Sequence, residues 1–446
     1  MNPVVISVLL MCVLCLLKFN VIISILLSAL VAGIMSGTGL NQVMNVFVGG
    51  MSGSNQIALS YILLGALAFG VAETGLASRF VTILERLFGK SGKLFILVLA
   101  GIASLSQNLI PIHIAFIPIL IPPLLRFMNK LNLDRRMAAC ALTFGLKAPY
   151  ILIPIGFGDI FQNIVATNMT LNGMEVVAGD VWSAVLLPVA GMAIGLLVAI
   201  FVTYRKPRAY QDLPIVALQS DTNPDSDNRE FGLPQWGALI GSVSAFVIQI
   251  VAHRFFGTGA SPAWALPIGA TVGVLIMLAT GAIKYQRFDY TIKGGIQLMG
   301  FIAFVMLVAS GFGAVIRETG GVATLIDSFV GVIGHSQLLG AIAMLAVGLF
   351  VTMGIGTSFG TVPIIATIFV PLGAALGFSP AAIIALIATA GAMGDAGSPA
   401  SDSTLAPSAG LGADNQHDHI WDTCVPTFIH FDIPLFVFGV IAAMVL

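Results

Sequence analysis

The stretch GDAGSPASDST, from Gly394 to Thr404, decides the fold because it places two aspartates directly after an apolar run. The preceding residues, 381–393, read AAIIALIATAGAM and carry no charge. An aspartate at the centre of a spanning helix costs roughly 2.5–3.5 kcal/mol on insertion scales. Two of them in one break require compensation, which protonation or a bound cation can supply. We therefore predict a broken transmembrane helix over 380–410.

The composition of the whole chain indicates a membrane protein. Of 446 residues, 58% are hydrophobic and only 9% are charged, and the mean hydropathy is +1.01. Seven apolar runs precede residue 204 and seven follow residue 233. The runs are apolar on all sides, which indicates helices rather than the alternating strands of a barrel. The expected fold class is an all-α polytopic membrane protein in the lipid bilayer. The net charge of -1 provides no basic surface for nucleic acid.

The chain has two similar halves. A polar stretch over 205–233 is predicted to be a cytoplasmic linker between a first repeat, 1–204, and a second repeat, 234–446. Matching features recur at offsets of 245 to 252 residues, namely ETG at 73–75 and 318–320, Ser106 and Ser358, and Pro149 and Pro399. Such duplication is typical of secondary transporters.

The basic residues predict that the two repeats are inverted. They cluster within 79–93, 126–136, 205–208 and 284–293, which the positive-inside rule places in the cytoplasm. The stretch after the first ETG is thus cytoplasmic, whereas its partner, 321–336, has no Lys or Arg. Seven apolar runs lie between the two stretches, and an odd number puts them on opposite sides. Both stretches are predicted to be amphipathic helices at the membrane interface.

Two further regions in each half are expected to leave the regular helix. Pro, Gly, Ser and Thr are frequent in 104–125 and in 354–376, which we predict to be re-entrant hairpins. A broken helix is predicted over 137–155, as the partner of the one over 380–410. Irregular backbone at membrane depth must be buried in protein or line a wet cavity. Matched interruptions in the two halves are therefore the best pointer to a transport site.

Two basic side chains stand out in the first half. Lys147 falls within an apolar run, at the place where Gly397 falls in the second repeat. It either replaces a cation as a built-in positive charge, binds a substrate carboxylate, or extends towards the membrane interface. His113 lies in the first hairpin and either binds substrate, carries a proton or packs as a neutral ring.

Two polar stretches of the second half also have an ordinary explanation as loops. In an ordinary loop, Asp395 and Asp402 would only cap helix ends. The matched break in the first repeat favours the site. Residues 413–424 contain two histidines, a cysteine and three acids, but their spacing fits no standard zinc site and indicates a polar loop.

The motif around Asp395 resembles a known signature. Gly394-Asp395, Ser398-Pro399 and Ser401-Asp402-Ser403-Thr404 match the GD-x-x-SP-x-SD-[ST]-T pattern of the NhaC-type sodium/proton antiporter family, within the ion-transporter superfamily. Residues 2–33 and 58–76 resemble its YuiF-like branch. The resemblance implies a homodimer in the bacterial inner membrane, with a scaffold domain and a mobile domain working as an elevator.

The same resemblance leaves more than one substrate open. Members are commonly named sodium/proton antiporters, yet some relatives in this branch are regarded as amino-acid permeases, with histidine among the suggested substrates. Ala396 and Gly397 stand where antiporter relatives often have a polar residue or Cys. Together with Lys147, this difference favours a carrier of an organic solute.

We therefore predict a secondary active transporter driven by a sodium or proton gradient. No other cofactor is expected, and no nucleotide-binding fingerprint or paired base and nucleophile indicates an enzyme. The alternatives are a strict Na+/H+ antiporter and, in another class, an ion channel. The predicted substrate-binding residues are Ser106, Asn108, His113, Lys147 and Thr361. The predicted coupling residues are Ser358, Asp395, Ser398, Ser401, Asp402, Ser403 and Thr404, with sodium ligands at Asp395, Ser398, Asp402 and Thr404.

Overall fold

The computed structural model shows a helical protein. It describes residues 2–17, 19–74, 91–108, 113–213, 232–256, 264–321, 324, 328, 331, 336–355, 357–399 and 401–446. Within these ranges the regular structure is helical, and no strand occurs. The all-α class expected from the apolar runs is confirmed.

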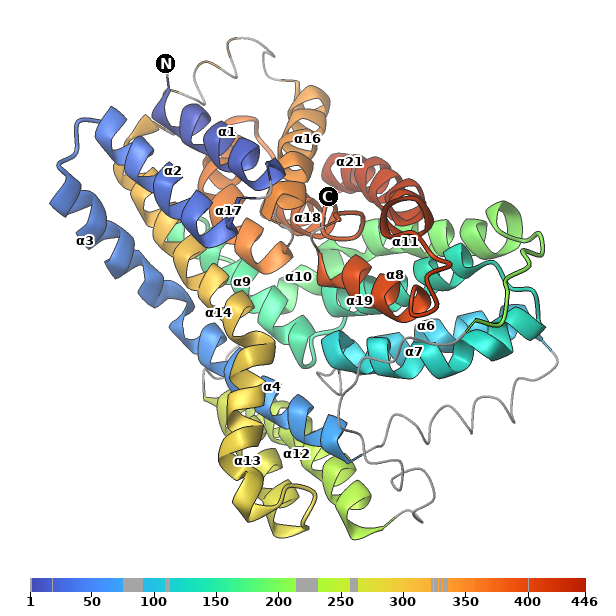
Figure 1. The fold of residues 1–446 in the computed structure, drawn as a ribbon. Coiled ribbons are helices and arrows are strands. Elements are labelled where there is room, and N and C mark those ends of the chain that lie inside the picture. Colours follow the sequence, from blue (N-terminus) through green and yellow to red (C-terminus); the bar gives the residue numbers. More distant parts are fainter. Residues whose placement is uncertain are drawn as a thin grey trace.

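One group of helices combines the beginnings of both halves of the chain (Figure 1). The long helix α14 runs along this group and packs against α2, α3 and α4, while α12 and α13 pair with each other beside α4. Its members are α1 (Pro3–Leu16), α2 (Val21–Met35), α3 (Leu40–Met51), η1 (Ser52–Ser54), α4 (Asn55–Glu73), α12 (Leu233–Phe256), α13 (Ala265–Ala279), η4 (Tyr285–Arg287) and α14 (Phe288–Glu318).

A second group combines the later parts of both halves. From the first half come α6 (Gly92–Asn108), α7 (His113–Lys130), α8 (Arg135–Leu152), α9 (Phe157–Leu171), α10 (Ala178–Ala184), α11 (Leu186–Val198) and η2 (Ala199–Thr203). From the second half come α16 (Gln337–Ile355), α17 (Ser358–Ala375), α18 (Pro380–Ala392), α19 (Asp402–Leu411), η5 (His419–Cys424), α20 (Val425–Thr427), η6 (Phe428–Asp432) and α21 (Ile433–Val445). The groups meet where α14 packs on α17 and α1 on α16. The two halves of the sequence are therefore interleaved.

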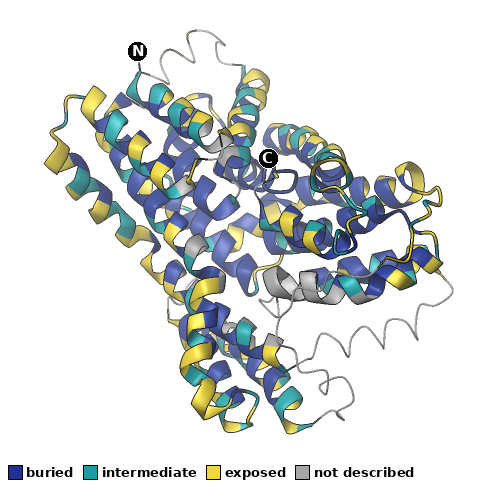
Figure 2. Cartoon of the chain, viewed as in Figure 1, coloured by how far each residue is buried: buried dark blue, intermediate teal, exposed yellow. Residues whose placement is uncertain are grey.

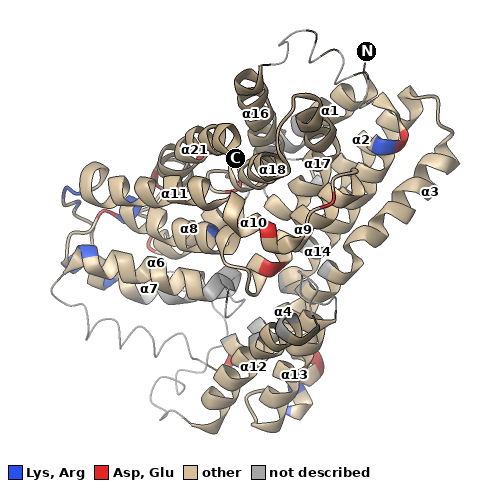
Figure 3. Ribbon diagram, turned by 180° about the vertical axis from the view of Figure 1, so that it is seen from behind, with Lys and Arg blue, Asp and Glu red and all other residues tan. Residues whose placement is uncertain are grey.

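The outer surface of the helices is apolar. Large hydrophobic side chains are exposed at helical spacing, as at Val243, Val247 and Ile250 on α12 (Figure 2). Charged side chains are few and gather mainly near helix ends (Figure 3). By length and composition, four helices of the described ranges are able to cross a membrane, or six when each of two bent pairs counts as one span. This surface fits a multi-pass membrane protein.

The predicted hairpins differ from the observed helices. Helix α16 ends at Ile355 and α17 begins at Ser358, and α17 then continues as one regular helix through Pro363 and Pro371. The interruption thus lies close to the start of the predicted 354–376 hairpin. The two prolines, about two turns apart, do not break α17, because neighbouring helices that enclose a helix allow it to tolerate proline. In the first half, α6 ends at Asn108 and α7 begins at His113, and residues 109–112 lie outside the described ranges.

The interruptions of the predicted broken helices also shift. In the first half, α8 continues to Leu152 with Lys147 and Pro149 inside it, and a bend of 52° separates it from α9. The interruption therefore falls at Ile153–Gly156, at the end of the stretch 144–154 in which the sequence predicts it. In the second half, α18 ends at Ala392 and α19 begins at Asp402. The quoted GDAGSPASDST stretch is thus the interruption itself.

Two helices are absent from the predicted apolar runs. Both α3 and α9 carry Asn and Gln among their apolar residues, and α9 also carries Asp159, so a search for hydropathy alone passes over them. Of the two predicted interface helices, the first falls on 75–90 and lies outside the described residues, as does most of the second, 321–336.

Candidate functional site: a buried ion pair at the α18–α19 break

The break between α18 and α19 brings backbone polar groups into the protein interior. Gly394 lies so close to α16 that a Cβ atom there would stand 2.5 Å from the backbone nitrogen of Met353. Only glycine permits this approach, which holds the next residue, Asp395, at the meeting point of α16, α17 and α8. Ser401 caps the N-terminus of α19, where its hydroxyl accepts a hydrogen bond from the Ser403 backbone nitrogen at 3.2 Å.

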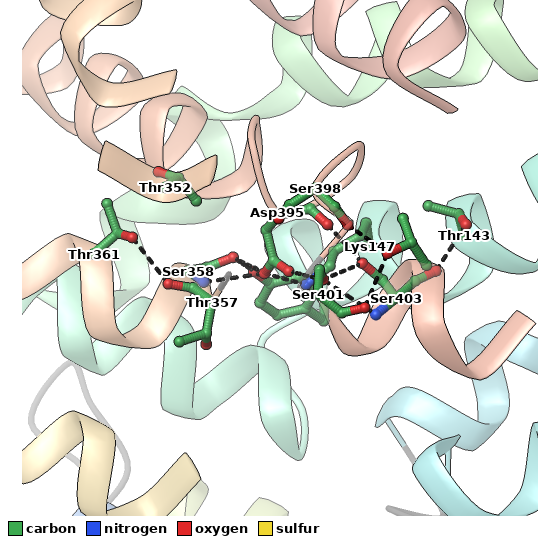
Figure 4. Close-up of polar contacts among 12 residues, drawn as sticks. Thr143, Lys147, Thr352, Thr357, Ser358, Thr361, Asp395, Ser398, Ser401 and Ser403 are labelled. Atoms are coloured by element: carbon green, nitrogen blue, oxygen red, sulfur yellow. Dashed lines mark hydrogen bonds and ion pairs between the residues drawn. The ribbon is translucent and has the colours of Figure 1, made fainter. Parts of the chain in front are cut away.

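Asp395 is the centre of the site (Figure 4). Its carboxylate accepts hydrogen bonds from the Ser358 backbone nitrogen at 3.0 Å, from the Ser358 hydroxyl and from the Ser401 hydroxyl. Ser358 is the first residue of α17, so the carboxylate also faces the positive end of a helix dipole. Asp395 is 2% exposed, and the interior around it offers little water to solvate its charge.

Lys147 provides the positive charge opposite Asp395. Its Nζ forms an ion pair with Asp395 Oδ2 and lies 4.8 Å from the centre of the Tyr150 ring, one turn further along α8. The Tyr150 hydroxyl donates to the Ser358 hydroxyl, so α8 contacts both the break and the start of α17. Lys147 is 6% exposed, and two opposite charges therefore stand together where neither would be stable alone.

Hydroxyl groups tie the break to the helices around it. The Ser403 hydroxyl donates to the Asp395 carbonyl oxygen at 2.8 Å, and the Thr404 hydroxyl donates to the Ser398 carbonyl. Thr143 on α8 donates to the Ser403 carbonyl at 2.8 Å. The Asp395 and Ser398 carbonyls lie outside the helices, and the Ser403 carbonyl in α19 lacks its usual donor because residue 407 is proline. These bonds therefore satisfy buried carbonyls that the helices leave free.

Several predicted residues come together here. Ser358, Asp395, Ser401 and Ser403 share one hydrogen-bonded cluster with Lys147. Thr404 and Ser398 lie at its edge, where the Ser398 hydroxyl donates to the Met353 carbonyl at 3.2 Å.

Other predicted residues lie apart from the carboxylate. Thr361 stands one turn along α17, and its hydroxyl donates to the Thr357 carbonyl at 2.9 Å. Asp402 begins α19 and, among the described residues, shares no hydrogen bond with Asp395, but it is close enough to interact electrostatically with both Asp395 and Lys147. Ser106 and Asn108 end α6 and His113 begins α7, but their side chains fall outside what the structure describes.

Several oxygens of the predicted sodium ligands already take part in hydrogen bonds or an ion pair. The oxygens of Asp395 are engaged by two hydroxyls, a backbone amide and an ammonium group, and Thr404 donates to Ser398. The Lys147 ammonium is thus the cationic group that neutralises Asp395 in this structure. Among the described residues, no three His, Cys, Asp or Glu side chains form a group able to hold a metal ion.

A second buried ion pair joins the start of α8 to the turn that follows α19. Arg135, the first residue of α8, donates through Nη1 and Nη2 to the two carboxylate oxygens of Asp414, at 2.6 Å each. The guanidinium also donates to the Asn129 side chain and to the Leu411 carbonyl, and it stacks on the Tyr210 ring at 4.3 Å. Burial alone would raise the pKa of Asp414, but the hydrogen bonds and charge of Arg135 outweigh it, so this pKa lies below its ordinary value of 3.8.

Three buried polar residues in and beside this region are not among the predicted site residues, namely Arg135, Tyr150 and Asp432, the last of which lies against Gly397. Arg135 was grouped with cytoplasmic basic residues, yet it is fully buried. Tyr150 carried a usable signal, because a residue three positions after Lys147 shares its helix face. Asp432 also carried one, since it is a lone acid within the apolar sequence FIHFDIPLF.

The fold and the site together define a class: an all-α, multi-pass membrane transporter. Two solved transporter structures have the same fold, with a TM-score of 0.60 each. One is the YdaH transporter of Alcanivorax borkumensis, 15% identical over 91% of this chain and 88% of that one. The other is MtrF of Neisseria gonorrhoeae, described within a class of antimetabolite efflux pumps, 17% identical over 92% and 85%.

The chain belongs to the Na+/H+ antiporter family, as the resemblance around Asp395 indicated. A family model of that description matches residues 141–440, and a second model, also described as a Na+-H+ antiporter family, matches residues 2–88. A membrane protein of Vibrio parahaemolyticus is 48% identical over the full length of both chains. A Bacillus subtilis protein named "Putative amino acid transporter YuiF" is 46% identical, also over the full length of both.

Proposed function

We propose that this protein is a gradient-coupled carrier of a small solute, an amino acid such as histidine, in the inner membrane of a bacterium. The observation that carries the proposal is the buried ion pair between Lys147 and Asp395 at an interrupted helix. An amino acid carries one carboxylate and one ammonium group. When the pair separates, Lys147 is suited to bind the carboxylate and Asp395 the ammonium, so that both buried charges remain neutralised.

The surroundings of the pair favour a zwitterion over a simple cation. A cation alone would have to compete with Lys147 for Asp395 and would leave the displaced ammonium unpaired in the interior. A zwitterion replaces both partners at once. The name of the Bacillus subtilis relative agrees with an amino-acid substrate. The predicted substrate residues Ser106, Asn108, His113 and Thr361 would then complete the site around the bound solute.

The packing of the helices suits an elevator mechanism. The group formed by α6–α11 and α16–α21 contains the site, whereas α1–α4 and α12–α14 form a separate layer against it. We assign the first group to the mobile domain and the second to the scaffold of a homodimer. The two groups each draw on both halves of the chain, which is the arrangement that inverted repeats, 1–204 and 234–446 joined by a cytoplasmic linker, would generate.

The decisive experiment is uptake of labelled histidine and other amino acids into proteoliposomes, driven by either a sodium or a proton gradient. Uptake by the wild type and loss of uptake in Asp395→Asn are expected. Asp289→Asn is the matched control, because Asp289 lies exposed on α14 in an ion pair with Lys293. Equal uptake by liposomes with and without the protein, for every amino acid tried, would refute this function.

Two alternative functions predict different results in the same liposomes. A strict Na+/H+ antiporter, with Asp395, Ser398, Asp402 and Thr404 as sodium ligands, would change the internal pH when sodium is added without any amino acid. A channel would conduct without counterflow. Faster exchange of labelled solute when unlabelled solute is present on the other side would exclude a channel.

A further inference from the structure

A carboxyl group outside the Asp395 cluster is buried without a partner. Asp432 is the last residue of η6, a π-helical turn at the start of the final helix, and it is 2% exposed. Neither Oδ1 nor Oδ2 has a hydrogen-bond partner among the described residues. π-Helical turns of this kind occur frequently at functional sites because they displace one side chain from the regular helical register.

The same carboxyl group touches the break that carries the site. A Cβ atom at Gly397 would stand 2.4 Å from Asp432 Oδ2, so the backbone of the break lies directly against this oxygen. Gly397 is two residues after Asp395. Any movement of the break therefore changes the surroundings of Asp432.

The basic groups nearby are already engaged. Lys147 pairs with Asp395. The His430 ring bonds to the Pro426 carbonyl at 2.7 Å and to the Thr203 hydroxyl at 2.9 Å. The helices α11, α16 and α18, which pack against this part of the chain, contain no titratable residue. Among the described residues, the titratable groups around this region are Lys147, Tyr150, Asp395 and Asp402 at the break, and Tyr204, Cys424 and His430 beside η6.

A charged carboxylate in this position would be costly. Removing an ion from water costs several kcal/mol even after the protein relaxes, and no cation or hydrogen-bond donor in the described part of the chain offsets that cost. A buried acid in such a place binds a proton instead. The close approach of Gly397 leaves no room between the break and Oδ2 for a methyl group, and thus none for an organic ammonium group. A proton requires no such space.

We propose that Asp432 carries the coupling proton of the transport cycle. In the conformation described above, its carboxyl group is protonated. When the break moves away, the group meets water, releases the proton to one side of the membrane and takes up another from the opposite side. This inference rests on the proposed transport function, and it names the ion and the residue that couple solute movement to a gradient.

The first test measures the proton directly in purified protein. Infrared spectra of the wild type are expected to contain the carbonyl band of a protonated carboxylic acid, and Asp432→Asn is expected to remove one such band that Asp289→Asn retains. Gly397→Ala keeps the acid but inserts a methyl group against it, so it is expected to shift the same band. Identical acid bands in the wild type and Asp432→Asn would overturn the proposal whether or not the protein transports amino acids.

The second test measures coupling in proteoliposomes. Asparagine mimics the protonated acid but releases no proton. Asp432→Asn is therefore expected to retain exchange of labelled for unlabelled amino acid, while uptake driven by a pH gradient falls about tenfold or more. Undiminished pH-driven uptake by this variant would overturn the proposal. Absence of both uptake and exchange in the wild type would instead refute the proposed function, and the infrared result would stand by itself.

Discussion

Helix α8 carries two buried cations that bind the same neighbouring region in different ways. Arg135 and Lys147 lie about three helical turns apart, and each pairs with an aspartate from the α18–α19 part of the chain. Arg135 directs its planar fork at both oxygens of Asp414 and binds three further groups. Lys147 presents one compact ammonium, and its partner Asp395 is shared with two serines.

The difference indicates which pair is able to open. A bidentate arginine pair loses all of its bonds together when it separates, because the geometry of the fork is fixed. A lysine pair is a contact between point charges, and its serine donors remain to solvate Asp395 when the ammonium turns to a substrate. We therefore assign a fixed structural role to Arg135–Asp414 and an exchangeable role to Lys147–Asp395.

Lys147→Met is expected to have the largest effect. It leaves Asp395 charged and unpaired, which should lower the free energy of unfolding by about 3–5 kcal/mol and abolish uptake. Denaturation of purified protein and uptake into liposomes measure the two effects. The double variant Lys147→Met/Asp395→Leu removes both charges and should regain much of the stability without any transport. Transport by the double variant would contradict the exchangeable role.

Asp414→Asn is expected to lower stability by a similar amount, about 3–5 kcal/mol, since Arg135 loses its counter-charge. Transport per folded molecule should remain near that of the wild type, in contrast to Lys147→Met. The double variant Arg135→Met/Asp414→Leu should recover stability and also transport. Loss of transport in that folded double variant would show that the Arg135 pair also moves during the cycle.

The Arg135–Asp414 pair also predicts a dependence of stability on pH. Because the pKa of Asp414 is lowered in the folded protein, its contribution is complete above its ordinary value of 3.8 and is lost as the pH falls through the lower folded value. Denaturation of the wild type and Asp414→Asn from neutral pH down to acidic pH measures this contribution. The difference in stability between them should shrink at the acidic end. A constant difference would contradict the assignment.

Arg135→Lys is a milder change at the same pair. It preserves the charge but loses the second parallel hydrogen bond and the bond to Asn129, at a cost of about 1.5–3 kcal/mol. Thermal denaturation in detergent should report this loss, with transport unchanged. Lys147→Arg provides the reciprocal comparison. We expect this variant to stay folded but to transport poorly, because a bidentate guanidinium would not separate readily from the Asp395 carboxylate.

Tyr150→Phe should have the smallest effect. It removes the hydroxyl that donates to Ser358 but keeps the aromatic ring beside Lys147. One hydrogen bond of this kind contributes about 0.5–1.5 kcal/mol, so KM should rise a few-fold with little change in maximal rate. Phe161→Leu, which alters a ring packed on Tyr150 without touching the polar cluster, is the matched packing control.

The sequence predicted the helical class and the break at Asp395 because both depend on local composition. An apolar run followed by two aspartates, three serines and a threonine has few structures available in a membrane. The ends of α8 and α17 could not be placed in the same way, since Pro149 and Pro363 stay helical only where neighbouring helices enclose them. Composition does not report that packing.

The ion pairs between the two halves of the chain could not be predicted from the sequence either. Lys147 was recognised as exceptional, but its partner follows 248 residues later, and nothing in either segment encodes the distance. The sequence predicts only that Arg135 lies in a cytoplasmic basic cluster, because burial of an arginine depends on Asp414, 279 residues away. Asp432 has no partner in the described residues, so only the folded structure reveals that its carboxyl group lies against Gly397.

The separation of these partners along the chain has a consequence for biosynthesis. At a translation rate of about 5–20 residues per second, the aspartates that neutralise Arg135 and Lys147 emerge on the order of 10–60 s after the cations themselves. The first half of the protein therefore enters the membrane with two unsatisfied positive charges on α8. Until the second half arrives, α8 must be shielded by the insertion machinery or remain near the aqueous interface, and a chain truncated before residue 395 would be a target for membrane quality control.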